Sequence, residues 1–331
     1  MELYLNEPVV PLPILHLVGR FDDPHAGADR TLLEIGAALA DVREVRFWAD
    51  GAVHPFFQAR GVVAVSPVAS LFPQDGMLLL AGIHIRLGDW LRQAQLYRVA
   101  LRYNLPDHGA LFAMIESLRE ACGLEPEIFF VSPALQAAVN LPGIIEPSLI
   151  DIAPFLKIFR RADRGVITVG RLSRDVIEKH HPLDVSLYKM LAAQGIQMRV
   201  MGGTCLRESL GDTPGVELIE AGAELQTEFL QSLDIFLYRT GSMYEAYGRI
   251  IFEAMASGMP VVASAHGGYA AWVAEDSGVT LFTTQEQAFN AVLALSASKP
   301  LREALGQRAR AKAIDLHGPA AKKTVLAHYL H

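Results

Sequence analysis

The stretch EAYGRIIFEAMASGMPVVA, residues 245–263, is the most informative part of this chain. Its apolar residues recur at helical spacing between Ile250 and Met255, which predicts a helix with one buried face. Gly258 is typical of the residue that follows a helix, and Pro260 prevents the helix from continuing. The Val-Val-Ala that comes next predicts a short buried strand.

The start of this helix is suited to binding a phosphate. We expect the helix to begin near residues 247–249, where its N–H groups and the positive end of its dipole face a ligand. Gly248 lets the backbone approach that ligand closely. Glu245 lies just before the helix and Glu253 about one turn inside it, so both carboxylates can reach one pocket. A helix start beside two carboxylates suits a ligand with a diphosphate and several hydroxyls, which describes a nucleotide sugar.

This pattern resembles a known family. Glu245 and Glu253, within the longer string, resemble the E-x7-E motif of the family-4 retaining glycosyltransferases, which have the GT-B fold. Arg171 follows an apolar run and a glycine, and Lys179 lies beyond it, which is similar to the segment that holds the donor diphosphate in that family. The resemblance is strong over roughly residues 165–281 and weak over the first 130 residues.

The resemblance implies roles for the matching residues. Glu253 would bind the ribose hydroxyls of the donor, and Glu245 would lie at the transferred sugar and its phosphate. Arg171 and Lys179 would stabilise the departing diphosphate, and His84 would lie near the transferred sugar. The catalytic candidates are therefore Glu245, Arg171, Lys179 and His84. The donor-binding candidates are Glu253, Gly248, Arg249, Tyr247, Gly27, Gly267, Gly268, Val216 and Leu218.

Several candidates also have an ordinary structural interpretation. Glu253 can complement the helix dipole, an effect of about 0.3–1 kcal/mol. Glu245 can be a solvated loop acid, and Arg249 either contacts the phosphates or points to solvent. The family usually has an acidic residue about two positions after Gly268, whereas this chain has Tyr-Ala-Ala-Trp at residues 269–272, so the identity of the donor sugar stays open.

Strand and helix patterns alternate along the whole chain, which predicts parallel sheets covered on both faces. We expect an α/β protein of the GT-B class, with two Rossmann-like doubly wound domains that face a central cleft. Residues 1–150 would form the acceptor domain and 151–314 the donor domain, and a last helix at about 315–331 can cross back onto the first. Strands are expected near 14–18, 44–48, 62–65, 77–81, 98–101, 128–131, 166–169, 197–201, 216–219, 234–238, 260–263 and 279–281.

Composition limits the class of protein. The 331 residues are 51% apolar and 20% charged, and no apolar run reaches the roughly 18 residues that would span a bilayer. Two distant cysteines, Cys122 and Cys205, indicate neither a disulfide framework nor a metal site and favour a reducing cytoplasm. Residues 1–150 hold 10 arginines, no lysine and 17 acidic residues, a balance of −7 that argues against nucleic-acid binding.

Partners and cofactors follow from the same reading. The expected partners are a nucleotide sugar, with UDP- or GDP-linked donors favoured, and a hydroxyl acceptor that can be lipid-linked. No Asp-x-Asp motif is present, so we expect no metal and no cofactor besides the donor. The segment 84–103 is either a solvated face or a basic amphipathic helix that would contact an anionic membrane. The second alternative would place a cytoplasmic enzyme peripherally at the inner face of the membrane.

The leading hypothesis is a retaining, metal-independent glycosyltransferase that makes a surface polysaccharide, a lipid-linked sugar or a natural product. The resemblance implies a front-face course, in which the leaving diphosphate takes the acceptor proton. The alternatives are a nucleotide-sugar epimerase of similar fold and a catalytically silent partner protein. A nicotinamide dehydrogenase is disfavoured, because no Gly-x-Gly-x-x-Gly follows the first expected strand.

Overall fold

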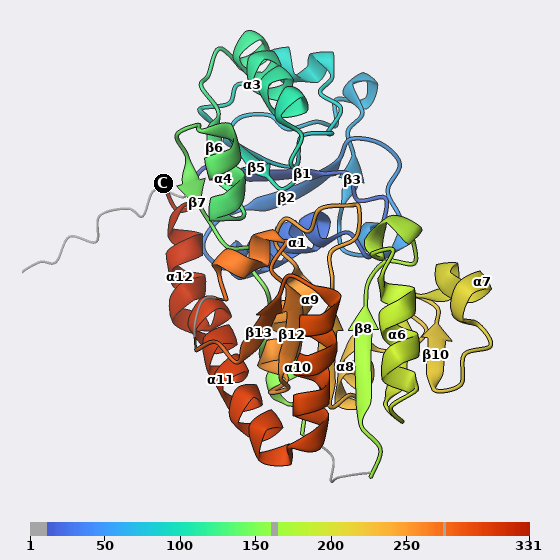
Figure 1. Cartoon of the computed structure of the whole chain (residues 1–331). Coiled ribbons are helices and arrows are strands. Elements are labelled where there is room, and N and C mark those ends of the chain that lie inside the picture. The colour runs from blue at the N-terminus through green and yellow to red at the C-terminus, as the bar shows by residue number, and fades with distance from the viewer. Residues whose placement is uncertain (1–11, 160–164, 274–275) are drawn as a thin grey trace, which may run out of the picture. The chain divides into compact units, whose positions relative to one another are not determined.

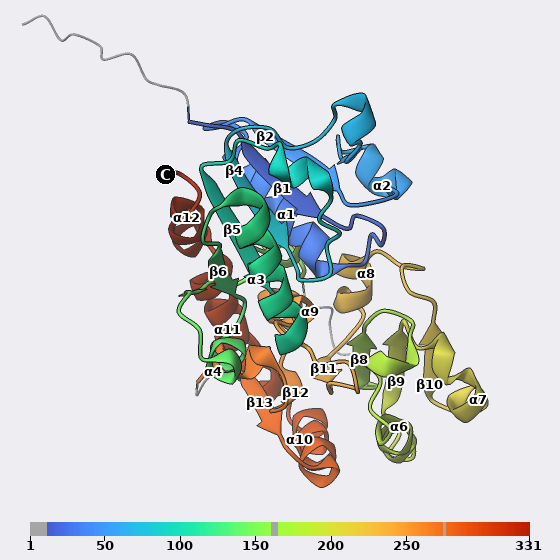
Figure 2. The same cartoon turned by 90° about the horizontal axis from the view of Figure 1, so that it is seen from above.

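The computed structural model describes residues 12–159, 165–273 and 276–331. The chain forms two compact units. Unit 1 comprises the described residues up to Phe129, Pro142–Ile144 and Lys323–His331, and unit 2 comprises Phe130–Leu141 and the described part of Ile145–Lys322. Each unit is built around its own sheet (Figures 1 and 2).

Unit 1 is built on a seven-stranded sheet with the order β3-β2-β1-β4-β5-β6-β7. Its strands are β1 (Leu15–Gly19), β2 (Val45–Ala49), β3 (Val63–Ala64), β4 (Met77–Ala81), β5 (Arg98–Tyr103), β6 (Glu127–Phe130) and β7 (Ile144–Ile145). The central strand β1 pairs in parallel with β2 and β4, and it is buried along its whole length. A parallel sheet is covered on both faces, which explains these near-continuous apolar runs.

The helices of unit 1 start and end at recognisable signals. They are α1 (Gly27–Leu39), α2 (Pro55–Gln58) and α3 (His108–Cys122), with single turns η1 (Pro67–Ala69) and η2 (Asp89–Arg92). The Asp107 carboxylate accepts a hydrogen bond from the N–H of Ala110 at 2.9 Å, which caps the first turn of α3. Gly123 ends α3 in the left-handed region.

The last residues of the chain complete unit 1. Helix α12 (Pro319–Ala327) runs into this unit, and Tyr329 behind it is fully buried, stacked on Phe129 at 5.8 Å between ring centroids. Arg98 donates to the carbonyl of His328 at 2.7 Å while it holds the Glu127 carboxylate at 2.6 Å. The segment Lys323–His331 is therefore part of the unit's packing.

Unit 2 is built on a six-stranded sheet with the order β10-β9-β8-β11-β12-β13. Its strands are β8 (Thr168–Leu172), β9 (Gln197–Met201), β10 (Val216–Ile219), β11 (Ile235–Tyr238), β12 (Val261–Ser264) and β13 (Val279–Phe282), and their pairings are parallel. The strand order reverses at β8, where β9 and β11 lie on opposite sides of it. In open α/β sheets, ligands bind outside the carboxyl ends of the strands near such a point.

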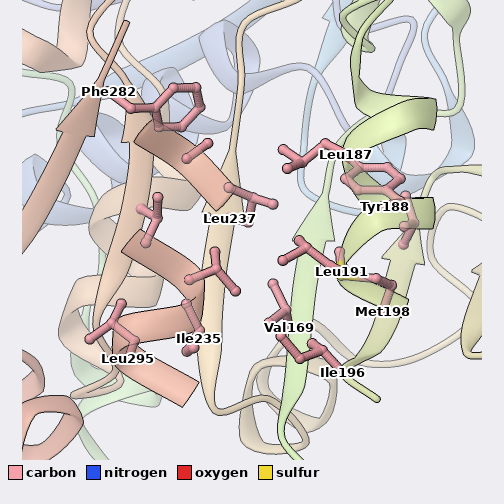
Figure 3. Close-up of a cluster of buried hydrophobic side chains, with 14 of the residues drawn as sticks. Val169, Leu187, Tyr188, Leu191, Ile196, Met198, Ile235, Leu237, Phe282 and Leu295 are labelled. Atoms are coloured by element: carbon pink, nitrogen blue, oxygen red, sulfur yellow. The ribbon is translucent and has the colours of Figure 1, made fainter. Parts of the chain in front are cut away.

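Helices of unit 2 supply the rest of its core. They are α4 (Pro133–Val139), α5 (Ala153–Leu156), α6 (Asp184–Ala192), α7 (Arg207–Leu210), α8 (Gln226–Gln231), α9 (Arg249–Ala256), α10 (Gln285–Ala297) and α11 (Lys299–His317), with short turns η3 (Ile177–Lys179), η4 (Thr204–Leu206) and η5 (Gly268–Ala271). Figure 3 shows α6 and α10 covering the sheet with Leu187, Leu191 and Leu295 against Val169 and Ile235. Helix α9 contacts β11, β12 and α11.

The expected strands are confirmed at all twelve places, with bounds that differ by up to two residues at most ends. The helix of the E-x7-E stretch begins at Arg249 and ends at Ala256, with Gly258 in the left-handed region behind it, as predicted. One prediction about β8 needs correction, because Gly170 and Arg171 lie inside the strand and not after it. The close approach of Leu233 to Gly170 explains why a glycine is needed there.

The basic amphipathic helix considered for residues 84–103 is wrong. This segment contains a loop, the single turn η2 and the buried strand β5. Arg98 pairs with Glu127, and Arg102 is buried and donates to the Tyr329 hydroxyl at 3.2 Å, so these arginines do not form a basic face. Within the described ranges, no helix is long and apolar enough to cross a membrane.

Candidate functional site

The loop before α9 is held by the glutamate that begins the E-x7-E motif. Gly248 caps the helix with φ +77° and ψ +53°, and its N–H donates to Oε1 of Glu245 at 3.1 Å. A Cβ at Gly248 would lie 2.8 Å from the ring of Tyr269, so glycine is required by both backbone angle and space. The carboxylate of Glu245 thus sits at the start of α9, where the sequence placed it.

Lys179 and Glu245 form an ion pair at this position. The Nζ of Lys179 lies 2.9 Å from Oε2 of Glu245, and the two side chains are 12% and 20% exposed. The hydroxyl of Tyr238, at the end of β11, donates to the same Oε2 at 2.8 Å. Burial raises the pKa of Glu245, but the charge of Lys179 and the hydrogen bonds from Lys179, Tyr238 and Gly248 outweigh it, so the pKa is lowered. Glu245 is therefore a carboxylate at neutral pH.

Glu253 is buried inside the first turns of α9. It is 1% exposed, and Oε2 accepts a hydrogen bond from the side-chain amide of Gln226. Arg249, one turn earlier, lies 3.9 Å from Oε1, and among the described residues no hydrogen-bond donor reaches that oxygen. A buried carboxylate oxygen with spare acceptor capacity is suited to bind a hydroxyl.

Arg171 holds the backbone of the residue that pairs with Glu245. Its side chain is fully buried, and the guanidinium donates to the carbonyls of Arg239, at 2.8 Å, and of Lys179. Asp184 at the start of α6 faces both arginines, at 3.8 Å from Arg171 and 3.5 Å from Arg239. In this arrangement Arg171 fixes the backbone that carries Lys179, and its direct contact with a diphosphate stays a prediction.

Arg249 and Tyr247 point into unit 2. Arg249 donates to the carbonyl of Leu149 at 2.6 Å, so it does not point to solvent, which was one of its two expected placements. Tyr247 is buried, stacks on Phe252 at 4.8 Å and shares a hydrogen bond of 3.2 Å with His317. The backbone of this loop faces Glu245, while these two side chains attach it to the core.

The turn at Gly267 and Gly268 packs directly on the glutamate loop. The N–H of Gly268 donates to the carbonyl of Glu245 at 2.8 Å, and a Cβ there would lie 1.7 Å from the carbonyl oxygen of Ala246. Tyr269 behind the pair is fully buried, and its hydroxyl lies 2.8 Å from Oγ of Ser264. The glycines therefore let two loops touch, and the tyrosine that stands in this atypical turn is packed inside.

The remaining donor-binding candidates are placed apart from these contacts. Val216 and Leu218 lie on the edge strand β10, and their side chains pack against the core of unit 2. Both side chains are partly exposed.

In unit 1, Gly27 is the first residue of α1, and His84 is an exposed residue of the loop after β4. Both belong to unit 1, and their predicted roles remain predictions. The sequence reading missed Asp29, two residues after Gly27. Asp29 accepts a hydrogen bond from the N–H of Phe21 at 3.0 Å, and burial raises its pKa to about 7. An acid in the first turn after a glycine loop was the signal that could have identified it.

The sequence reading also missed three residues of unit 2: Tyr238, Gln226 and Asp184, which contact Glu245, Glu253 and Arg171 respectively. In the part of the chain that the structure describes, no cluster of three or more His, Cys, Asp or Glu side chains could hold a metal ion.

Known proteins resemble this chain in two ways. Residues 160–312 match the family model of glycosyl transferases group 1. No curated protein matches the chain by sequence. HepE of Anabaena, solved with UDP, is 16% identical, and the match covers 96% of this chain and 99% of that one with a TM-score of 0.72. A glycosyltransferase from Rickettsia africae gives 13% identity, 96% and 97% coverage and a TM-score of 0.72.

Sucrose-phosphate synthase from Thermosynechococcus elongatus is similar to the same extent, with 16% identity, 96% and 98% coverage and a TM-score of 0.70. The chain has the GT-B fold of two Rossmann-like domains. The family match over the unit 2 site supports a glycosyltransferase, and the similar structures show the fold.

Proposed function

We propose that this protein is a retaining glycosyltransferase of the family-4 type, which transfers a sugar from a UDP-sugar to a hydroxyl acceptor. One observation carries the proposal: Lys179 and the N–H of Gly248 converge on the Glu245 carboxylate at the start of α9, one turn before the buried Glu253. UDP is the first nucleotide to test, because HepE has been solved with UDP and with UDP-glucose.

The chemistry of the proposed site is positioning and charge stabilisation. The bond between the anomeric carbon and the diphosphate oxygen breaks, and negative charge develops on the diphosphate. Lys179 and the N-terminus of α9 stabilise that charge. The acceptor hydroxyl attacks the same face that the diphosphate leaves, and its proton passes to the leaving phosphate oxygen, so the configuration is kept. Glu253 would hold the ribose hydroxyls.

The proposed acceptor is a hydroxyl group. A hydroxyl on a surface polysaccharide, a lipid-linked sugar or a natural product fits the front-face course equally well. We place the enzyme in the cytoplasm, where nucleotide sugars would meet it, and we propose that it works without a metal ion. Activity that persists in excess EDTA would support the last point.

The test is donor binding followed by turnover. Isothermal titration with UDP and UDP-glucose is compared for the wild type, Glu253→Gln and Glu245→Gln. Glu286→Gln is the matched control, because Glu286 is an exposed acid in the first turn of α10. We expect the control to bind like the wild type and Glu253→Gln to lose affinity at least tenfold, since a charge-assisted hydrogen bond contributes about 1.5–3 kcal/mol.

Turnover then separates the alternatives. UDP release that depends on an added acceptor, with the anomeric configuration kept in the product, supports the proposal. Conversion of UDP-glucose to another UDP-sugar without acceptor would identify an epimerase instead. If UDP, GDP, ADP and dTDP sugars all fail to bind, the silent-partner alternative is favoured.

A further inference from the structure

The hydroxyl of Tyr238 makes a hydrogen bond that the packing of its strand does not need. It is the last residue of β11, 1% exposed, in a strand whose other residues are apolar. Its hydroxyl donates a 2.8 Å hydrogen bond to Oε2 of Glu245. A buried hydroxyl needs a partner, and a phenylalanine would fill the same space without one. The hydroxyl therefore has its role at Glu245.

The direction of this hydrogen bond is fixed. Burial first, and then the charge of Glu245, raise the pKa of Tyr238 well above its usual range, so the phenol keeps its proton. The lowered pKa of Glu245 keeps that carboxylate charged, so it is the acceptor. A hydrogen bond to an ionised acceptor is stronger than one between neutral groups.

The ring of Tyr238 is held on several sides, so its hydroxyl is aimed. The guanidinium carbon of Arg171 lies 4.6 Å from the ring centroid. Phe236 stacks on the ring at 6.4 Å, and Tyr269 meets it edge-on at 6.1 Å. A side chain fixed in this way loses little further freedom when it holds the carboxylate.

Donor binding changes what holds Glu245. In this structure Oε2 of Glu245 receives both Lys179 and Tyr238, and Oε1 receives the N–H of Gly248. Under the proposed function, Lys179 binds the donor diphosphate instead of Glu245. Glu245 then has no ion pair, and the bound diphosphate adds a negative charge near it. The Tyr238 hydroxyl and the Gly248 N–H are the two remaining contacts of the three.

We propose that Tyr238 is a positioning residue for sugar transfer: its hydroxyl keeps Glu245 oriented and ionised when the donor takes Lys179 away. This inference rests on the function proposed above. It assigns Tyr238 no contact with the substrate, because the residue acts through Glu245.

The charged and titratable groups around Glu245 define what else could affect its ionisation. Lys179 reaches it from η3, and Tyr244 and Tyr269 lie close enough for their pKa values to be raised in part by its charge. The guanidinium carbon of Arg171 lies 4.6 Å from the centroid of the Tyr238 ring. Tyr269 is the best control, because it is also buried and its hydroxyl bonds Ser264 and Thr240 instead of Glu245.

The experiment compares Tyr238→Phe with Tyr269→Phe. The pKa of Glu245 is measured by carbon-13 NMR of labelled glutamate carboxyls, with the signal assigned by its loss in Glu245→Gln. We expect Tyr238→Phe to raise this pKa by about one unit and Tyr269→Phe to leave it unchanged, because a hydrogen bond to the charged form lowers a pKa. The rise should be larger with UDP bound.

Kinetics supply the second readout. We expect kcat/KM of Tyr238→Phe to fall about tenfold and the acid limb of its pH profile to move upward with the Glu245 pKa. Equal Glu245 pKa values in all three proteins would overturn the inference, whatever their activity. The NMR titration of Glu245 does not depend on turnover, so it tests the inference separately from the proposed function. A wild type that binds no UDP-sugar would refute the proposed function.

Folding of the variant is checked separately. Phenylalanine keeps the ring contacts with Arg171 and Phe236, so Tyr238→Phe should unfold thermally close to the wild type. If it does not fold, the hydroxyl proton of Tyr238 in the wild type gives the same answer. A slowly exchanging hydroxyl signal that disappears in Glu245→Ala, which leaves no acceptor, supports the inference, and a signal unaffected by that change refutes it.

Discussion

His317 should make unit 2 sensitive to mild acid. This residue ends α11, is 5% exposed and shares a 3.2 Å hydrogen bond with Tyr247, so it joins the helix to the loop of Glu245. Burial, with a smaller contribution from the charge of Arg249, lowers its pKa to about 3. An unfolded chain has the ordinary histidine pKa of about 6.5.

The sign follows from these two values. As the pH falls below about 6.5, the unfolded chain binds a proton that the folded unit does not, so the free energy of unfolding decreases. The loss continues until the pH reaches the folded pKa of about 3. A pH of about 5 lies about 1.5 units below the histidine pKa of the unfolded chain. At 1.36 kcal/mol per unit, the free energy of unfolding is therefore lower by about 2 kcal/mol.

The assay isolates this one group by difference. Urea unfolding is followed at about pH 7 and pH 5 for the wild type and for His317→Gln, whose amide can still bond Tyr247. Fluorine NMR of 5-fluorotryptophan reports unit 2 through Trp272, which lies beside Tyr247, whereas Trp48 and Trp90 report unit 1. His180, whose pKa burial lowers to about 4, contributes equally to both proteins and cancels.

We expect the wild type to lose about 2 kcal/mol more stability than His317→Gln between the two pH values. His84→Gln is the control, because His84 is exposed and lies in unit 1. If the wild type and His317→Gln lose the same stability in the Trp272 transition, the buried neutral histidine does not explain the acid sensitivity of unit 2.

Three further predictions concern single contacts. Lys179→Met removes the ion pair with Glu245 and should weaken UDP binding at least tenfold by calorimetry; unchanged affinity would remove Lys179 from the site. In urea unfolding, Gly248→Ala should destabilise unit 2 more than Gly195→Ala. Both residues have φ +77°, but only a Cβ at Gly248 would meet Tyr269, at 2.8 Å. Equal losses of about 1 kcal/mol in the two variants would contradict this. Arg98→Met should lower the stability of unit 1 by about 1–3 kcal/mol, whereas Arg119→Met should leave it unchanged because the glutamate pairs of Arg119 are exposed. A similar loss in both variants would show that the contacts of Arg98 with His328 and Glu127 do not stabilise unit 1.

Local patterns predicted the sheet strands and the helix of the E-x7-E stretch, because both depend on neighbours in sequence. Apolar runs bounded by glycine and proline located β11, α9 and β12 within a residue or so. The helical repeat placed Glu253 in the first turns of α9, and Glu245 was placed before the helix because the helix was expected to begin near residues 247–249.

The errors arose where the partner is distant in sequence. Arg171 was expected to follow its strand, but β8 extends through it, so the side chain enters the core toward Asp184. The segment 84–103 allowed a basic helix as one alternative although a strand was expected near 98–101, and the contacts of Arg98 with Glu127 and of Arg102 with Tyr329 belong to that strand. Strand and helix patterns overlap in short mixed segments, and only tertiary pairing separates them.

The contacts of Tyr329 bear on the order in which the protein folds during its synthesis. Domains generally fold as units while the chain emerges, the N-terminal one first. Here the fully buried Tyr329 stacks on Phe129 and takes a hydrogen bond from Arg102, so the packing of unit 1 is complete only after that residue has left the ribosome. All residues of unit 2, up to Lys322, have been made by then. The unit that begins the chain is therefore the last to finish folding.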